Sequence, residues 1–256
     1  MSGSATAYAI AVHKLAAGYG PVPVIRDVSW RLAPGSLAAV IGPNGGGKST
    51  LLKTLVGLVA PAAGEVRVFG RHPQAVRRRI AYLAQGEEVD WSFPITVWDV
   101  VMQGRWLRRG LWGRLDGRDR ERVRAALAQF GIEPLANTQI GSLSGGQRQR
   151  VFLARAVAQE ADIILLDEPN TGLDARAQHE LAETLIDLRE EGRTIVIATH
   201  DLDCLTECFD QVLALKNEVV AVGPPREVMT GELLTALFSR HFPSIRDTGE
   251  VVIHEH

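Results

Sequence analysis

A glycine-rich segment between an apolar run and a helical pattern constrains this chain more than any other feature of its sequence. Residues 42–49 read Gly-Pro-Asn-Gly-Gly-Gly-Lys-Ser, directly after the apolar residues 37–41 and before the helical pattern 50–58. This is the pattern of a phosphate-binding loop, in which glycines turn backbone N–H groups toward a phosphate and a helix N-terminus adds positive potential. In that pattern Lys48 reaches the β and γ phosphates and Ser49 ligates Mg²⁺. A glycine-rich turn without a ligand is the alternative, and the strand-loop-helix context disfavours it.

Short apolar runs rich in β-branched residues alternate with longer amphipathic segments, which indicates an α/β fold. Residues from about 96 to 159 contain no convincing strand, so we expect a helical insertion there. After Gly223 we expect a short helical segment from 226 to about 239 and then a polar tail. Besides residues 37–41, the expected strands are residues 65–69, 80–83, 163–166 and 194–198.

The composition is that of an ordinary soluble globular protein. Apolar residues make up 46% of the 256 residues, charged residues 23%, and the formal net charge is -2, so the overall charge indicates neither a nucleic-acid nor a lipid partner. No run approaches the roughly 18 apolar residues of a spanning helix, and the N-terminus lacks a signal-peptide pattern. Cys204 and Cys208 are one helical turn apart, a spacing that favours free thiols over a disulfide. We therefore expect a soluble, cytoplasmic protein.

A second apolar run ends in two acidic residues. Residues 163–166 are all Ile or Leu, and Asp167 and Glu168 follow directly. This arrangement places one acid near Mg²⁺ and the next beside the γ phosphate of a bound nucleotide. We therefore expect Asp167 to hold Mg²⁺ through water and Glu168 to act as the general base that polarises the attacking water. Two acids that merely end a buried strand are the alternative, and the phosphate-binding loop disfavours it.

A third motif begins a long helical pattern. Residues 143–147 read Leu-Ser-Gly-Gly-Gln, and the pattern continues to about Gln159. Ser144 suits the helix N-cap, and the two glycines expose N–H groups that suit an anion, although a capped surface helix without a ligand has the same features. This peptide and the order of the other motifs resemble the ABC ATPase family. The resemblance extends from Tyr19 to His200 and beyond.

The resemblance implies a RecA-like P-loop NTPase core with an inserted helical subdomain at about residues 86–159 and an N-terminal antiparallel β part. The ATP-binding domain would then span residues 8–240, with a C-terminal tail at 241–256. The resemblance also implies a head-to-tail homodimer. Each ATP, with its Mg²⁺, would lie between the phosphate-binding loop of one subunit and residues 144–147 of the other.

Four further residues receive roles from the resemblance alone. Tyr19 would stack on the adenine, and Asp174 would couple the two sites across the dimer. Gln85 would contact Mg²⁺ and the attacking water and sense the membrane partner. His200 would be the switch that contacts the γ phosphate. Without the other motifs, Tyr19 would suit packing and His200 a purely structural role.

The motifs and the resemblance together define the candidate site. The expected catalytic residues are Lys48, Gln85, Glu168 and His200. The expected Mg²⁺ ligands are Ser49, Gln85 and Asp167. The expected nucleotide contacts are Tyr19, Gly42, Pro43, Asn44, Gly45, Gly46, Gly47, Lys48, Ser49, Thr50, Gln85, Ser144, Gly145, Gly146, Gln147 and Asp174.

The chain departs from the family pattern at two places. Gly46 stands where the family usually has Ala or Ser, a change that would loosen the loop without removing a ligand. Residues 170–172, Asn-Thr-Gly, differ modestly from the commonest lead into the loop at Asp174. Neither departure removes a residue needed for hydrolysis.

The segment before and within the helical insertion carries the indication of substrate. Residues 89–97, 99–102 and 104–105 resemble the corresponding segment in motors of zinc and manganese importers. Four of the five tryptophans fall between Trp91 and Trp112, which suits docking against a permease and equally suits packing within the subdomain. Eight arginines between Arg105 and Arg124 suit lipid headgroups or an acidic partner, although a solvated surface is the preferred interpretation.

The sequence thus predicts an ATP-hydrolysing transporter subunit at the cytoplasmic face of the inner membrane. Its expected partners are a membrane permease and a periplasmic or lipid-anchored metal-binding protein, with no nucleic acid, and its expected cargo is zinc or manganese. Uptake of an iron chelate or haem is the first alternative. A soluble ABC ATPase of DNA repair or translation would usually carry tandem motors or a coiled coil. A module without turnover conflicts with Glu168 and His200, and metal sensing by the Cys and His residues lacks a zinc-site pattern.

Overall fold

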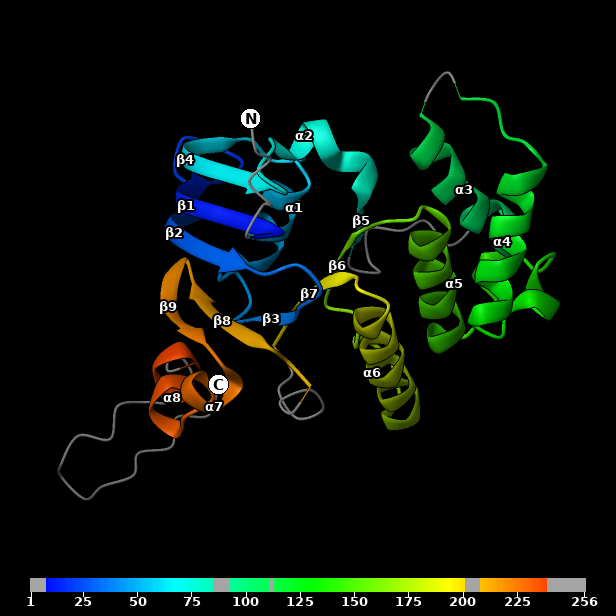
Figure 1. The fold of residues 1–256 in the computed structure, drawn as a ribbon. Coiled ribbons are helices and arrows are strands. Elements are labelled where there is room, and N and C mark those ends of the chain that lie inside the picture. The colour runs from blue at the N-terminus through cyan, green and yellow to red at the C-terminus, as the bar shows by residue number, and fades with distance from the viewer. Residues whose placement is uncertain (1–7, 85–92, 111–112, 201–207, 239–256) are drawn as a thin grey trace, which may run out of the picture.

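A computed structural model of the chain describes residues 8–84, 93–110, 113–200 and 208–238. Two sheets organise these residues: six strands in the order β5-β6-β7-β3-β8-β9 and three in the order β2-β1-β4. Figure 1 shows the smaller sheet beside α1, and the helices α3, α4 and α5 grouped together apart from it. The expected α/β class, with an N-terminal antiparallel part, is confirmed.

The larger sheet is parallel except at one edge. Its strands are β3 (Leu37–Ile41), β5 (Ile80–Leu83), β6 (Ile163–Asp167), β7 (Thr194–Thr199), β8 (Gln211–Lys216) and β9 (Glu218–Gly223), of which β9 alone runs antiparallel to its neighbour. Every residue of β3, β6 and β7 is buried, which explains their continuous apolar sequences, because both faces of a parallel sheet are covered. The four strands that the sequence predicts in this sheet are confirmed to within one residue at each end.

The smaller sheet is antiparallel. Its strands are β1 (Ile10–Ala17), β2 (Ile25–Leu32) and β4 (Pro61–Val68). The strand predicted at 65–69 overlaps β4, which ends one residue earlier and begins four residues earlier, because Pro61 and Ala63 already pair with β1. The exposed side of β2 carries charged and polar residues, so this sheet has one buried and one solvated face.

The strand β3 separates two apolar cores. Ala38 and Val40 pack with α1 (Lys48–Leu55) and with the smaller sheet. The other three residues of β3 face the second core, which contains apolar residues of α3 to α6. The helix predicted at 50–58 starts earlier and ends at Leu55, because Gly57 adopts a left-handed conformation with φ 80°.

The described residues between 96 and 159 form helices and turns, with one isolated bridge between Thr96 and Gln139. Each of the three α-helices begins with a capping box, in which two side chains accept each other's backbone N–H. The predicted helical insertion is confirmed for these residues. Its elements are α3 (Val97–Arg109), α4 (Gly117–Gln129), the 3₁₀ turns η3 (Glu133–Leu135) and η4 (Ile140–Ser142), and α5 (Gly145–Ala158).

The remaining helices lie outside the helical insertion. They are α2 (Pro73–Val76), the 3₁₀ turn η1 (Arg77–Arg79), α6 (Ala175–Glu190), α7 (Pro225–Val228) and α8 (Gly231–Phe238). The prediction of one helical segment at 226–239 is wrong, because Met229 leaves the helical conformation with ψ 41°. A new helix then starts where Thr230 Oγ1 accepts a hydrogen bond from the Leu233 N–H at 3.4 Å.

Among the described residues, the helices are too short or too polar to cross a membrane. Cys208 is a partly buried free thiol, whereas Cys204, Trp91, Trp112 and the tail at 241–256 lie outside the described residues.

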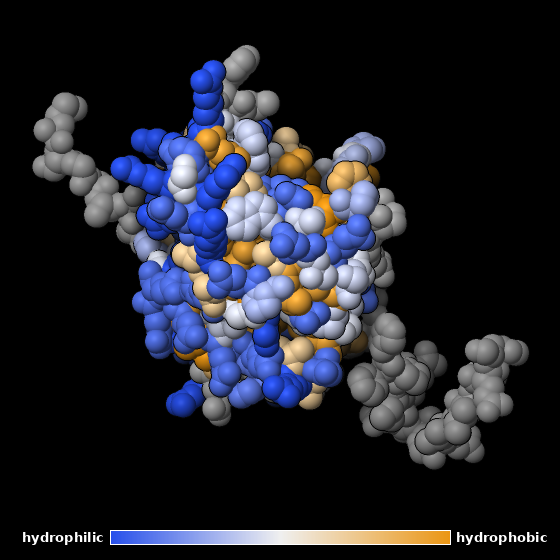
Figure 2. Space-filling model, turned by 90° about the vertical axis from the view of Figure 1, so that its right-hand side faces the viewer, coloured by the Kyte–Doolittle hydropathy of each residue, from blue (hydrophilic) through white to orange (hydrophobic). Residues whose placement is uncertain are grey.

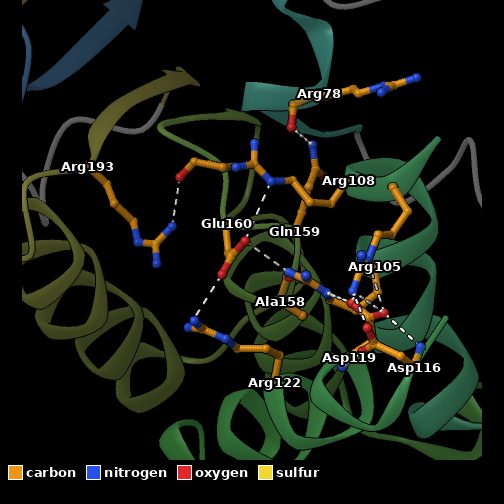
Figure 3. A network of polar contacts seen from close by, with 12 residues as sticks. Arg78, Arg105, Arg108, Asp116, Asp119, Arg122, Ala158, Gln159, Glu160 and Arg193 are labelled. Atoms are coloured by element: carbon orange, nitrogen blue, oxygen red, sulfur yellow. Dashed lines mark hydrogen bonds and ion pairs between the residues drawn. The ribbon is translucent and has the colours of Figure 1, made fainter. Parts of the chain in front are cut away.

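A buried ion-pair network joins α3, α4 and the end of α5 (Figure 3). The Arg105 guanidinium donates to Asp119 Oδ1 at 2.8 Å and to the Ala158 carbonyl at 2.6 Å. Glu160, directly after α5, pairs with Arg105 at 3.2 Å, Arg108 at 3.5 Å and Arg122 at 3.4 Å. The arginine-rich stretch is therefore not simply a solvated surface. That interpretation is wrong for Arg105, which is 6% exposed. Its guanidinium is buried among the acceptors of the network and donates to them.

Asp119 is the fully buried acid of this network, with no exposed side-chain surface. Burial by itself raises the pKa of Asp119, but hydrogen bonds from the Asp116 N–H, Arg109 and Arg105 outweigh it and lower the pKa to about 2. The same carboxylate completes the capping box of α4. Asp119 therefore stabilises the start of α4 and, through the network, the packing of α3, α4 and α5.

We expect Asp119→Asn to lower the free energy of unfolding by about 3 kcal/mol, because it removes one of the two carboxylates that pair with the buried Arg105 and leaves only Glu160. Urea denaturation at pH 7 measures this change. The matched control is Asp187→Asn on the exposed side of α6, which should change the free energy by less than about 0.5 kcal/mol. Equal effects of the two variants would contradict the role of the network.

The contribution of Asp119 should also depend on pH. Its pKa is lowered from 3.8 to about 2 in the folded protein, so the ionised form stabilises the fold above about pH 4, and this stabilisation is lost as the pH falls toward 2. The difference in unfolding free energy between the wild type and Asp119→Asn should therefore shrink over that interval. A difference that grows on acidification would contradict the assignment.

Candidate nucleotide-binding and catalytic site

The glycine-rich loop joins β3 to α1 and passes close to the strand β8. A Cβ atom on Gly42 would lie 2.0 Å from the Leu215 carbonyl oxygen, so only glycine fits there. Gly47, the residue before α1, has φ 96°, and a Cβ on it would lie 2.2 Å from Ile25 Cγ2. Glycine is thus required at both positions, because the loop passes close to Leu215 and to Ile25. The loop leads directly into the N-terminus of α1.

Gly46 is held firmly rather than loosened. Its N–H donates to the Pro43 carbonyl at 3.0 Å, and its carbonyl accepts from the Asn217 N–H at 2.8 Å. A Cβ atom would approach the Pro43 and Leu215 carbonyl oxygens to 2.9 and 3.0 Å. A larger residue here would therefore require the loop to shift.

Lys48 lies buried beneath the loop, with 4% of its surface exposed. Its ammonium group donates to the Gly42 carbonyl at 3.0 Å and to the Pro43 carbonyl at 3.3 Å. It also lies 3.4 Å from Glu168 Oε1. The charge predicted to reach a phosphate is thus held by the loop on one side and by the acidic end of β6 on the other.

Ser49 and Asp167 meet as the sequence predicts for a metal site. Ser49 Oγ donates to Asp167 Oδ1 at 3.0 Å, and the Tyr82 phenol donates to Asp167 Oδ2 at 3.0 Å. Burial raises the pKa of Asp167, while the hydrogen bonds from Ser49 and Tyr82 act to lower it.

These donors suit one metal in particular. A hydroxyl and a carboxylate are hard oxygen ligands, which fit Mg²⁺ when phosphates and waters complete its shell. Among the described residues, no cluster of three or more His, Cys, Asp or Glu side chains could hold a metal ion. A site of few protein ligands, as Mg²⁺–nucleotide complexes use, therefore matches the donor set better than an all-protein cage.

Glu168 adopts a left-handed backbone conformation with φ 50°, which is uncommon for a residue with a side chain. Its N–H donates to the Ala198 carbonyl at 2.8 Å, so β7 holds the turn in place. Its Oε1 lies 3.3 Å from His200 Nδ1, and its side chain is 12% exposed. The structure therefore brings together Lys48, Glu168 and His200, three of the four predicted catalytic residues. The fourth, Gln85, lies outside the described residues.

The Leu-Ser-Gly-Gly-Gln peptide starts α5 with a closed cap. Gln147 N–H donates to Ser144 Oγ at 3.3 Å, and Ser144 N–H donates to Gln147 Oε1 at 2.9 Å. The apolar residues of α5 pack in the core on one face of β3, whereas those of α1 pack in the core on the other. Within one chain, the peptide and the phosphate-binding loop thus belong to helices on opposite faces of the sheet.

The remaining predicted contacts are exposed or flank the loop. The Tyr19 ring is 66% exposed in the turn between β1 and β2. Asp174 is the N-cap of α6, where Oδ1 accepts from the Ala177 N–H at 2.8 Å. Asn44 and Gly45 are exposed at the tip of the loop, whereas Thr50 is buried in α1.

Sequence reasoning missed two residues of this site. Asn217 connects β8 to β9 with φ 64°, and its side-chain amide donates to the carbonyls of Val24 at 2.9 Å and Gly45 at 3.3 Å. Its own carbonyl accepts from the Arg26 N–H at 2.8 Å. The other residue is Tyr82, which binds Asp167. An asparagine between two short apolar runs indicates a turn but not its tertiary contacts, and a tyrosine within a strand gives no such signal.

We expect Asn217→Ala to lower nucleotide affinity about fivefold to tenfold, because it removes the amide that joins Gly45 of the phosphate-binding loop to Val24, the residue before β2. Binding of a fluorescent ATP analogue measures this change. Asn137→Ala, in the turn after η3, is the control and should bind as tightly as the wild type. Unchanged affinity in Asn217→Ala would show that the loop keeps its shape without this residue.

Comparisons with known proteins agree with this geometry. The family model described as "ABC transporter" matches residues 25–171. The zinc transport system ATP-binding protein TroB of Treponema pallidum is 44% identical over 241 residues, 94% of this chain and 91% of that protein. The manganese transport system ATP-binding protein MntB of Bacillus subtilis is 40% identical over 240 residues, 94% of this chain and 96% of that protein.

A solved structure supports the same conclusion. The structure described as an inward-facing conformation of a putative metal-chelate type ABC transporter superposes with a TM-score of 0.79 at 32% identity, covering 91% of this chain and 89% of that one. The residues that the family model matches include the phosphate-binding loop and the acidic end of β6. The chain therefore belongs to the ABC transporter family, as one of its ATP-hydrolysing cassettes.

Proposed function

We propose that the chain energises import of a divalent transition metal, zinc or manganese, through a separate membrane permease. The observation that carries the ATP-driven part of this proposal is the meeting of Lys48, Glu168 and His200 beside the Ser49–Asp167 pair. The proposed place of action is the cytoplasmic face of the inner membrane. A periplasmic or lipid-anchored metal-binding protein would deliver the ion, and nucleic acid has no part in the cycle.

The proposed chemistry assigns one task to each side chain. Lys48 binds the β and γ phosphates, and Tyr19 stacks on the adenine. Ser49 and Asp167 hold Mg²⁺, which supplies charge neutralisation to the phosphates when bound. Glu168 accepts a hydrogen bond from the attacking water, and His200 contacts the γ phosphate. Glu168 and His200 lie 3.3 Å apart. This short distance supports the two roles, because the attacking water and the γ phosphate must also lie next to each other.

We propose that two copies of the chain assemble head to tail. The Leu-Ser-Gly-Gly-Gln peptide and the phosphate-binding loop belong to helices on opposite faces of one sheet, so a second copy is needed to bring a peptide to each loop. The N–H groups at the start of α5 would then meet the γ phosphate of the partner's ATP. Asp174, exposed at the start of α6, would lie at the contact between the two copies.

The surface of the helical insertion supports docking to the permease. Trp106 and Leu107 on α3 are 50% and 53% exposed, and Phe93 is 62% exposed. Figure 2 views this side of the molecule and shows apolar side chains exposed between hydrophilic ones. Trp98, in contrast, packs against the second core with Arg124 over its ring at 6.0 Å. Of the two tryptophans of this segment that the structure describes, Trp98 therefore packs in the protein and Trp106 lies on an exposed surface suited to an apolar partner.

The cargo rests on the relatives. Zinc and manganese appear in the names of relatives that align along nearly the whole chain. The 32% identical solved structure is described as metal-chelate type, which favours a chelate as the second candidate. We place the free divalent ion first, because the relative named for zinc is 44% identical, whereas a relative from Yersinia pestis named for chelated iron is 41% identical.

We expect Glu168→Gln to lower ATPase activity at least 100-fold while ATP stays bound, because glutamine keeps the shape of the side chain but does not act as a base. The variant should accumulate as an ATP-bound dimer, which size-exclusion chromatography with light scattering detects. Glu183→Gln on α6, whose side chain is 65% exposed, is the control and should retain full activity. Undiminished turnover in Glu168→Gln would rule out this residue as the base.

We expect ATPase activity of the chain reconstituted with its permease to rise when the capture protein is loaded with zinc or manganese. Loading with ferric chelates should leave activity at its basal level. Phosphate release in proteoliposomes measures the response. Stimulation only by ferric chelates would transfer the proposal to the second candidate, and hydrolysis indifferent to every metal would remove the metal from it.

Trp106→Ala should reduce the stimulation without changing ATP affinity.

A further inference from the structure

The magnesium-binding carboxylate has a second hydrogen-bond donor that none of the motifs includes. Tyr82, on β5, donates from its phenol to Asp167 Oδ2 at 3.0 Å, while Ser49 donates to Oδ1 at 3.0 Å. Each oxygen of the carboxylate therefore has its own donor. The two donors come from different elements, one from the edge strand β5 and one from the first turn of α1.

The surroundings of Tyr82 fix the position of its phenol. The strand β5 pairs in parallel with β6, and Tyr82 lies opposite Leu165, two residues before Asp167. The ring packs against the core that contains α1. The Tyr82 carbonyl accepts from Arg155 of α5 at 3.4 Å, which also ties this strand to the helix that starts with the Leu-Ser-Gly-Gly-Gln peptide.

Two fixed donors determine the orientation of the carboxylate plane. Asp167 is 4% exposed, so solvent offers little alternative to these two hydrogen bonds. With Oδ2 occupied by the phenol, Oδ1 is the oxygen left beside Ser49, where both would face one metal shell. Partners behind a metal ligand commonly change metal affinity or activity by about 10-fold to 100-fold when removed, because they orient the ligand.

We propose that Tyr82 is a positioning residue that orients Asp167 for the Mg²⁺–nucleotide complex. This inference rests on the proposed function, since it assumes that Asp167 takes part in holding the metal. Tyr82 does not itself contact the nucleotide in this scheme. Its hydroxyl acts only through the carboxylate, so its loss should change metal dependence and leave metal-free nucleotide binding as it is.

The test is Tyr82→Phe, which keeps the ring and removes the hydroxyl. We expect the Mg²⁺ concentration for half-maximal ATPase activity to rise about tenfold, with activity at saturating Mg²⁺ reduced less than about threefold. Mn²⁺ binding to the nucleotide-loaded protein, followed by electron paramagnetic resonance, should weaken by about the same factor. Affinity for a fluorescent ATP analogue in EDTA should equal that of the wild type.

The matched control is Tyr8→Phe, which removes a phenol hydroxyl from a ring that lies under Arg31 beside the smaller sheet. It should match the wild type in all three measurements. Unchanged Mg²⁺ and Mn²⁺ dependence in Tyr82→Phe would overturn the proposal, as would an equal loss of nucleotide affinity with and without metal, which indicates a structural role. A wild-type protein without metal-dependent nucleotide binding would instead refute the proposed function itself.

Discussion

Parallel pairing of β6, β7 and β3 is the constraint on which the site depends. In a parallel sheet the carboxyl ends of neighbouring strands meet at one edge, and ligands bind there. Lys48 follows β3, Glu168 follows β6 and His200 follows β7. Glu168 therefore lies 3.4 Å from Lys48, which is 120 positions away along the chain, and 3.3 Å from His200. The complete burial of the three strands supplies the apolar contact that holds this edge in register.

The polar contacts at that edge supply hydrogen bonds and opposite charges to the charged side chains that are buried there. Lys48 is neutralised by Glu168 and by loop carbonyls, and Asp167 receives a hydroxyl at each oxygen. A buried charge without such partners would cost several kcal/mol. These internal partners hold the charged side chains of the site in place.

The helical insertion is tied to the core by a second set of buried polar groups. Gln159 is 2% exposed and donates to the carbonyls of Arg78 at 3.1 Å and Ile80 at 2.9 Å, next to the Glu160 network of Figure 3. These contacts attach the end of α5 to the start of β5, the strand that carries Tyr82. The helix that begins with the Leu-Ser-Gly-Gly-Gln peptide and the strand that supports Asp167 thus share an anchor.

The sequence by itself determined the class of fold, the central strands and the motifs whose side chains meet at the carboxyl end of β6. Runs such as 163–166 are apolar at every position because both faces of the sheet are buried there. The phosphate-binding loop, the Leu-Ser-Gly-Gly-Gln peptide and the two acids can each be recognised from a few consecutive residues. Tertiary structure alone decided the rest. The bonds of Asn217 and Tyr82 join residues more than 80 positions apart, and Arg105 is buried only because Asp119 and Glu160 meet it from two other elements. Contacts of this kind depend on how elements pack, and no periodicity along the chain records them.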